Sequence, residues 1–184
     1  MSSNNQFDED VFIDKDSFIM NSKIGRYSTI GKNNHIFYSN IGNFVSVSWN
    51  VTIGAIQHEI RTITTHAFPY SSAFDMSNNN DLAKIGTIIG HDVWIGTGAI
   101  IMSGVTVGNG VIIGAGSIIT KDIEAYSVVA GNPAKLLYKR FDDNLILELE
   151  RIQWWYWEKE KIQKNITYFK ENLTVEILNK ITSK

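Results

Sequence analysis

The chain has 184 residues, of which 43% are hydrophobic and 20% are charged, a balance typical of one globular domain that can bury a core. The 17 lysines and arginines are offset by 19 aspartates and glutamates, so the net charge is -2. The chain therefore lacks the excess of lysine and arginine over acidic residues that is typical of proteins that bind nucleic acids or anionic membrane surfaces. The absence of cysteine excludes disulfides, thiolate metal sites, iron–sulfur clusters and a cysteine nucleophile.

The first ten residues, MSSNNQFDED, are polar and acidic. No apolar run in the chain approaches the roughly 18 residues that a membrane span requires. We therefore expect a cytoplasmic protein without membrane insertion, and we interpret residues 1–12 as a lead-in to the folded domain.

Two stretches of the chain repeat an aliphatic residue at every sixth position. The first stretch includes Ile24 and Ile30 and, after a shift of one residue, continues from Ile41. The second stretch contains six such residues in register, at Ile89, Ile95, Ile101, Val107, Ile113 and Ile119. A period of six fits neither an α-helix nor a long strand. It favours a short strand followed by a glycine-assisted turn, with three such units closing one coil.

The tandem unit of an aliphatic residue, a glycine, two further residues and a small or branched residue resembles the hexapeptide-repeat acyltransferase family. The resemblance implies an all-β fold, a left-handed parallel β-helix of triangular section, over residues 13–135. The handedness comes from the family alone, because parallel strand connections are otherwise right-handed. The two repeat blocks amount to roughly five coils.

Residues 55–82 lose the six-residue period and are expected to form a loop inserted between the two repeat blocks. This segment holds two of the four histidines, His58 and His66, together with Phe68 and Tyr70. Long excursions from a compact solenoid are usually functional or disordered. We interpret this one as a catalytic loop.

The repeat ends at the sequence GNPAK, residues 131–135, and residues 136–184 carry apolar side chains at helical spacing. We expect one or two C-terminal helices there. Trp154, Trp155 and Trp157 are expected to lie where these helices fold back, covering the open end of the last coil.

Several local sequences narrow the resemblance: TTHAFPY in the loop, IGHDVWIG at residues 89–96, GNPAK, and the tryptophan-rich tail. Together they resemble the xenobiotic acetyltransferase branch of the family. The resemblance implies transfer of an acetyl group from acetyl-CoA to a hydroxyl or amine of a carbohydrate-like acceptor, in surface polysaccharide biosynthesis. Acetylation of an antibiotic of the chloramphenicol or streptogramin type is the alternative.

The branch carries its catalytic histidine at the position of His58, which would act as a general base for direct transfer without an acyl-enzyme. His66 and Trp94 are expected to contact the acceptor. The family positions for acetyl-CoA correspond to Gly98, Ala115, Thr120, Lys121 and Lys135. Lys139 and Arg140 are expected to join the two lysines around the phosphates of the cofactor. No metal is expected.

The family also implies a homotrimer, in which each site lies between two subunits. Outward residues such as Phe37, Phe44 and Trp49 would line the subunit contact.

Two other classes of protein stay open. The same fold hosts zinc carbonic anhydrases with three histidines on neighbouring coils, and it also occurs as a non-catalytic scaffold. His35 and His91 are interpreted as surface residues of the repeat. The motif H-E-x-x-H is not completed after His58, because Thr62 stands where the second histidine would be.

Overall fold

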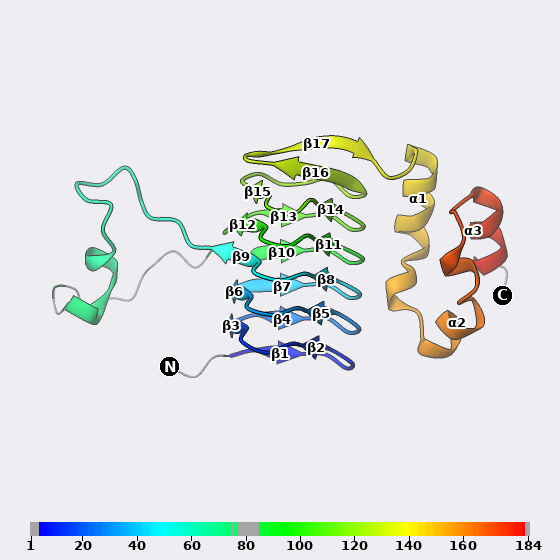
Figure 1. Cartoon of the computed structure of the whole chain (residues 1–184), viewed down its shortest axis with the longest axis horizontal. Helices are drawn as coiled ribbons and strands as arrows, with labels where there is room; N and C mark the ends of the chain where they lie inside the picture. The colour runs from blue at the N-terminus through cyan, green and yellow to red at the C-terminus, as the bar shows by residue number, and fades with distance from the viewer. Residues whose placement is uncertain (1–3, 75, 77–84, 183–184) are drawn as a thin grey trace.

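The repeated aliphatic residues form the core of the molecule. In the computed structural model, which describes residues 4–74, 76 and 85–182, every one of them from Ile24 to Ile119 is at most 4% exposed. They point into a prism of stacked coils, each built from three short strands (Figure 1). The expected fold is confirmed: a parallel β-helix with an inserted loop and a C-terminal helical segment.

Each side of the prism is one sheet, and the two narrower sheets have five parallel strands each. One has the order β1 (Gln6–Phe7), β4 (Lys23–Ile24), β7 (Ser39–Ile41), β10 (Thr87–Ile89) and β13 (Thr106–Val107). Another has the sequence-ordered strands β3 (Phe18–Met20), β6 (His35–Phe37), β9 (Thr52–Ala55), β12 (Ile100–Met102) and β15 (Ile118–Ile119). These strands make five complete coils.

The third sheet has seven strands. It contains β2 (Phe12–Ile13), β5 (Thr29–Ile30), β8 (Ser46–Val47), β11 (Trp94–Ile95), β14 (Ile112–Ile113), β16 (Ser127–Gly131) and β17 (Ala134–Lys139). The last strand, β17, runs antiparallel to β16, so a hairpin ends the prism (Figure 1).

The register keeps like side chains above one another through the stack. Ile24 pairs with Ile41, Ile41 with Ile89, and Ile89 with Val107. The inserted loop does not interrupt this column, because β7, which precedes the loop, pairs directly with β10, which follows it. The turns stack as closely as the strands: a Cβ atom on Gly42 would lie 2.6 Å from the carbonyl oxygen of Gly90.

The first coil begins at Gln6 rather than at residue 13, which corrects the expected lead-in over residues 1–12. Strand β1 pairs in parallel with β4, with Phe7 opposite Ile24. The repeat is hard to recognise there because phenylalanines stand in the strands of this end coil, and Phe7 and Phe12 are 48% and 63% exposed.

The helical segment also begins later than expected, since residues 136–139 belong to β17. The α-helices are α1 (Asp143–Ile152), α2 (Lys159–Lys164) and α3 (Val175–Thr182). The Asp142 side chain accepts a hydrogen bond from the backbone N–H of Leu145, 2.9 Å away, and so caps α1. Short 3-10 helices cover Phe68–Tyr70, Ser72–Phe74, Trp154–Tyr156 and Tyr168–Lys170.

The tryptophans of this segment do not cover the open end of the last coil, as the sequence had suggested. The hairpin of β16 and β17 occupies that end, and the helices run alongside the coils (Figure 1). Arg26, on a turn of the second coil, donates hydrogen bonds to the carbonyl oxygens of Trp155 at 3.2 Å and Trp157 at 2.6 Å. The tryptophans therefore pack against the side of the prism.

Candidate active site

His58 lies on the loop that leaves the prism after β9, and this loop extends away from the coils on the side opposite the helices (Figure 1). The histidine is exposed, and its Nδ1 lies 2.6 Å from the carbonyl oxygen of Thr65. A carbonyl oxygen only accepts, so Nδ1 carries the proton of this hydrogen bond. In the neutral ring the lone pair is then on Nε2, which can accept a proton from another molecule.

The acidic neighbour of His58 does not take part in this arrangement. Glu59 turns back on its own backbone, where its Oε1 accepts hydrogen bonds from the N–H groups of Ile60 at 2.9 Å and Arg61 at 3.0 Å. The loop thus orients the histidine through a backbone carbonyl and uses the carboxylate to stabilise a turn.

His66 occupies the same loop and is also exposed. Its Nδ1 accepts a hydrogen bond from the backbone N–H of Phe68, 3.0 Å away, and the two rings lie 5.8 Å apart. The expected contact of His66 with the acceptor stays a prediction. Its hydrogen bond shows that the side chain braces the following turn.

Two of the positions expected to hold acetyl-CoA lie on turns that stack on each other. Gly98 follows β11 and Ala115 follows β14, and these two strands are paired. Gly98 has a φ of 70° and nothing lies within 4 Å of where its Cβ would be. The Cβ position of Gly98 therefore faces open space, and Ala115 on the stacked turn is exposed.

The other expected cofactor positions gather at the end of the prism. Thr120 and Lys121 line a cavity of about 310 Å³ together with Ala134 and Leu136, the residues on either side of Lys135. Lys135 itself is exposed on β17. The cavity thus brings Thr120 and Lys121 together at the last coil, whereas Lys135 does not line it, because neighbouring side chains on a strand point to opposite faces.

Lys139 and Arg140 do not join this group of cations, which corrects the expected phosphate cluster. Lys139 pairs with Glu124 at 2.8 Å, and Arg140 pairs with Asp92 at 3.2 Å while donating to the carbonyl oxygen of Gly110. Their charges are already balanced within the chain. Over the part of the chain that the structure describes, neither Lys121 nor Lys135 forms an ion pair.

Trp94, the second residue expected to contact the acceptor, lies on β11 with 55% of its surface exposed. It points outward from the seven-stranded sheet, whereas His58 and His66 lie on the loop. The hydrogen bonds described above for the two histidine rings are with residues of that loop. One copy of the chain therefore does not gather all the expected site residues in one place.

His91 is not the plain surface residue that the sequence suggested. Its Nδ1 accepts a hydrogen bond from the backbone N–H of Asn43 at 2.8 Å, and its Nε2 lies 2.9 Å from the hydroxyl of Tyr156. Its ring stacks on Trp155 at a centroid distance of 5.2 Å. Burial lowers the pKa of His91, so the ring stays neutral. No sequence pattern connects His91 and Asn43 with Trp155 and Tyr156, because the 3-10 helix that carries the two aromatic residues is far away along the chain.

Within the described ranges, no three histidine, cysteine, aspartate or glutamate side chains lie close enough to hold a metal ion. Among the same residues, no helix combines the length and apolar character needed to cross a membrane.

Comparison with known proteins agrees with this architecture. Residues 86–121 match the family described as bacterial transferase hexapeptide (six repeats). The chain is 34% identical over 151 residues to a probable macrolide acetyltransferase of Lysinibacillus sphaericus, covering 78% of this chain and 84% of that protein. It is 42% identical over 129 residues to a chloramphenicol acetyltransferase of Agrobacterium fabrum, covering 67% of this chain and 62% of that enzyme.

Solved structures share the fold. A maltose O-acetyltransferase from Clostridium difficile 630 is 28% identical with a TM-score of 0.51, over 76% of this chain and 68% of that one. The likeness to the macrolide acetyltransferase extends over most of that protein, and the repeats build the expected coils. The chain therefore belongs to the hexapeptide-repeat acyltransferases, in their xenobiotic acetyltransferase branch.

Proposed function

We propose that this chain transfers an acetyl group from acetyl-CoA to a hydroxyl or amine of a small carbohydrate-like acceptor, with His58 as the general base. The observation that carries the proposal is the hydrogen bond between His58 Nδ1 and the carbonyl oxygen of Thr65. It anchors the ring and, with the proton on Nδ1, leaves the lone pair of the neutral ring on Nε2. A positioned imidazole of this kind is the most common general base in enzymes.

Acetyl-CoA supplies the acetyl group as a thioester, whose sulfur leaves readily as a thiolate. His58 Nε2 takes the proton from the acceptor hydroxyl as the hydroxyl oxygen forms its bond to the acetyl carbon. The bond from that carbon to sulfur breaks, and the proton held by His58 passes to the thiolate. No residue of the chain is acetylated in this scheme, so no acyl-enzyme forms.

The residues at the last coil fit the phosphates of acetyl-CoA. Lys121 and Lys135 are exposed and, over the described residues, form no ion pair, so they can bind phosphate oxygens without first breaking a contact. The open turn at Gly98 leaves room for the narrow pantetheine arm of the cofactor, and Ala115 is exposed on the turn stacked on it.

The working form of the enzyme is proposed to be a homotrimer. The loop that carries His58 projects from its own prism, and the prism faces expose apolar side chains, among them Trp49, Ile88 and Trp94 at 50–56% exposure. Phe44, which was expected in the subunit contact, instead packs against Trp154 of its own chain at 4.8 Å, and Phe37 is half-buried beside Phe18. Light scattering should give three times 20.7 kDa. A monomer with full activity would contradict the shared site.

The acceptor is proposed to be a sugar of surface polysaccharide biosynthesis, supported by the likeness to a maltose O-acetyltransferase. An antibiotic is the second candidate, because the macrolide and chloramphenicol acetyltransferases are 34% and 42% identical to the chain. A thiol-release assay with acetyl-CoA separates the two. Its panel should contain monosaccharides, nucleotide sugars, chloramphenicol, a macrolide and a streptogramin.

Turnover with a sugar alone supports the first acceptor class, and turnover with an antibiotic alone replaces it with the second. The absence of acceptor-dependent thiol release across the whole panel would count against acetyl transfer to either class.

A further inference from the structure

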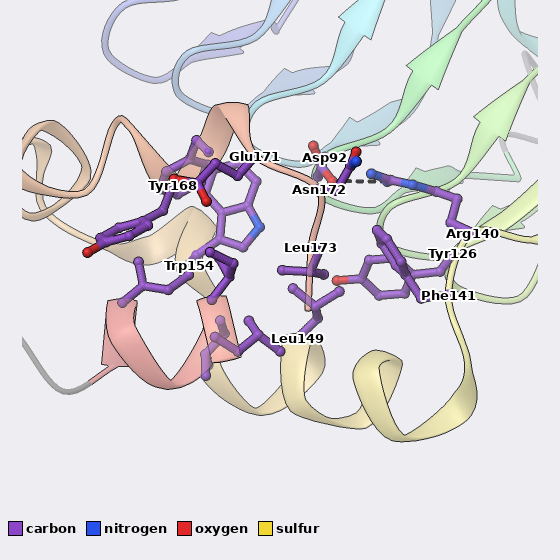
Figure 2. Close-up of a pocket in the computed structure, with 15 residues that line it drawn as sticks. Asp92, Tyr126, Arg140, Phe141, Leu149, Trp154, Tyr168, Glu171, Asn172 and Leu173 are labelled. Carbon is purple, nitrogen blue, oxygen red and sulfur yellow. Dashed lines mark hydrogen bonds and ion pairs between the residues drawn. The ribbon is translucent and has the colours of Figure 1, made fainter. Parts of the chain in front are cut away.

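A second cavity, of about 380 Å³, lies between the prism and the C-terminal segment (Figure 2). Residues of α1 and α3 supply most of an apolar wall, which includes Leu149, Ile177 and Leu178. Trp154 and Leu173 close other sides. None of the residues assigned above to acetyl transfer lines this cavity. Its volume falls within the range of pockets that bind small molecules.

The phenol of Tyr126 is the polar group that makes this cavity unusual. The side chain is 1% exposed, and its hydroxyl has no hydrogen-bond partner among the residues that the structure describes. Figure 2 shows the hydroxyl pointing into the cavity, toward Leu173. Buried hydroxyls are nearly always paired, because an unpaired one loses its hydrogen bonds to water without replacement.

The ring of Tyr126 cannot easily turn toward another partner. Its backbone N–H donates to the carbonyl oxygen of Asn109 at 2.7 Å, and its ring lies against Phe141 with a centroid distance of 6.0 Å. The Arg140 guanidinium lies 5.7 Å from the centre of the same ring. Burial and the nearby carboxylates of Glu150 and Asp92 raise the pKa of Tyr126, so the hydroxyl remains a neutral donor.

The charges at the edge of the cavity do not call for a charged ligand. Arg140 is paired with Asp92 at 3.2 Å and also donates to the carbonyl oxygen of Gly110 at 2.7 Å. Glu171 and Asn172 also line the cavity, and both are exposed to solvent. With the Arg140–Asp92 pair balanced, the rest of the lining is mostly hydrocarbon and aromatic, and the Tyr126 hydroxyl is its buried donor without a partner among the described residues. The matching ligand is apolar over most of its surface and carries one acceptor.

We propose that this cavity binds a neutral, mainly apolar small molecule through a hydrogen bond from the Tyr126 hydroxyl to a carbonyl oxygen of the ligand. Such a molecule would contact the prism through Tyr126 and the helices through Leu149 and Ile177. The cavity is separate from the residues proposed for acetyl transfer. Ligand binding to it can therefore be tested without measuring acetyl-transfer activity.

Acetophenone and ethylbenzene form a matched pair of probes, because they differ mainly in the carbonyl oxygen. Their dissociation constants should be measured by NMR titration on the wild-type protein and on Tyr126→Phe. Removing the hydroxyl should weaken acetophenone relative to ethylbenzene by about 3- to 10-fold. The control Tyr138→Phe changes a tyrosine that is 60% exposed on β17 and should leave the ratio unchanged.

A ratio that is the same in the wild type and in Tyr126→Phe would overturn the proposal, as would failure of both probes to bind at millimolar concentration. If Tyr126→Phe does not fold, the wild-type protein still provides a test. Nuclear Overhauser contacts between the acetophenone methyl group and the Tyr126 ring are then expected, and binding without such contacts would place the probe elsewhere.

Discussion

Replacing His91 with alanine should loosen the attachment of the C-terminal segment to the prism. The histidine connects three elements: a turn of the third coil through Asn43, the 3-10 helix through Tyr156, and the buried ring of Trp155. The variant removes both hydrogen bonds and the stacked ring in one step.

The size of the effect follows from these contacts. The Asn43 N–H loses its acceptor while the residue is only 7% exposed, which costs about 1–3 kcal/mol. Tyr156 is 55% exposed and can turn to water, so its bond adds about 0.5 kcal/mol. Loss of the ring pair adds about 0.5–1.5 kcal/mol. We expect the free energy of unfolding to fall by about 3 kcal/mol.

Urea unfolding followed by tryptophan fluorescence measures this change, since the buried Trp155 becomes exposed to water when the segment detaches. His35→Ala is the matched control, because His35 is exposed on β6 and should change the free energy of unfolding by less than about 0.5 kcal/mol. A His91→Ala variant as stable as that control would refute the reasoning.

Three further outcomes are expected. Burial lowers the pKa of His91, so the unfolded chain binds the proton more readily than the folded one. The stability advantage of the wild type over His91→Ala should therefore shrink as the pH falls below about 6.5. An advantage that stays constant down to pH 5 would contradict this. Lys135→Ala should raise the KM for acetyl-CoA and leave the acceptor KM unchanged, as steady-state kinetics can show; the opposite split would move the cofactor site. Gly96→Ala should lower the melting temperature, because its Cβ would lie 2.6 Å from the backbone nitrogen of Ala115, whereas Ala73→Gly on the exposed loop should not.

The prism could be predicted from the sequence because each coil repeats the same local rule. The residues of a single six-residue repeat are enough to identify a buried aliphatic residue such as Ile95 or Ile113. The rule fails at both ends of the prism. Phe7 replaces the aliphatic in the first coil, and Leu136 stands in a terminal strand whose pairing with β16 is antiparallel.

The attachment of the helices could not be predicted, because it depends on contacts between distant residues. Arg26 and Asn43 hold the carbonyl oxygen of Trp155, and nothing in their local sequence indicates this. The same limit applies to the candidate site. The position of His58 came from the resemblance to a family, whereas its hydrogen bond to Thr65 became visible only in the folded loop.

The central claim is that His58 removes the proton from the acceptor, and the kcat of His58→Ala in the thiol-release assay tests it most directly. His35→Ala, which changes an exposed histidine on a coil, is the control. We expect His58→Ala to lower kcat by about 10² to 10⁴, with the affinity for acetyl-CoA nearly unchanged and His35→Ala fully active. A His58→Ala enzyme that turns over at the wild-type rate would remove this histidine from the mechanism.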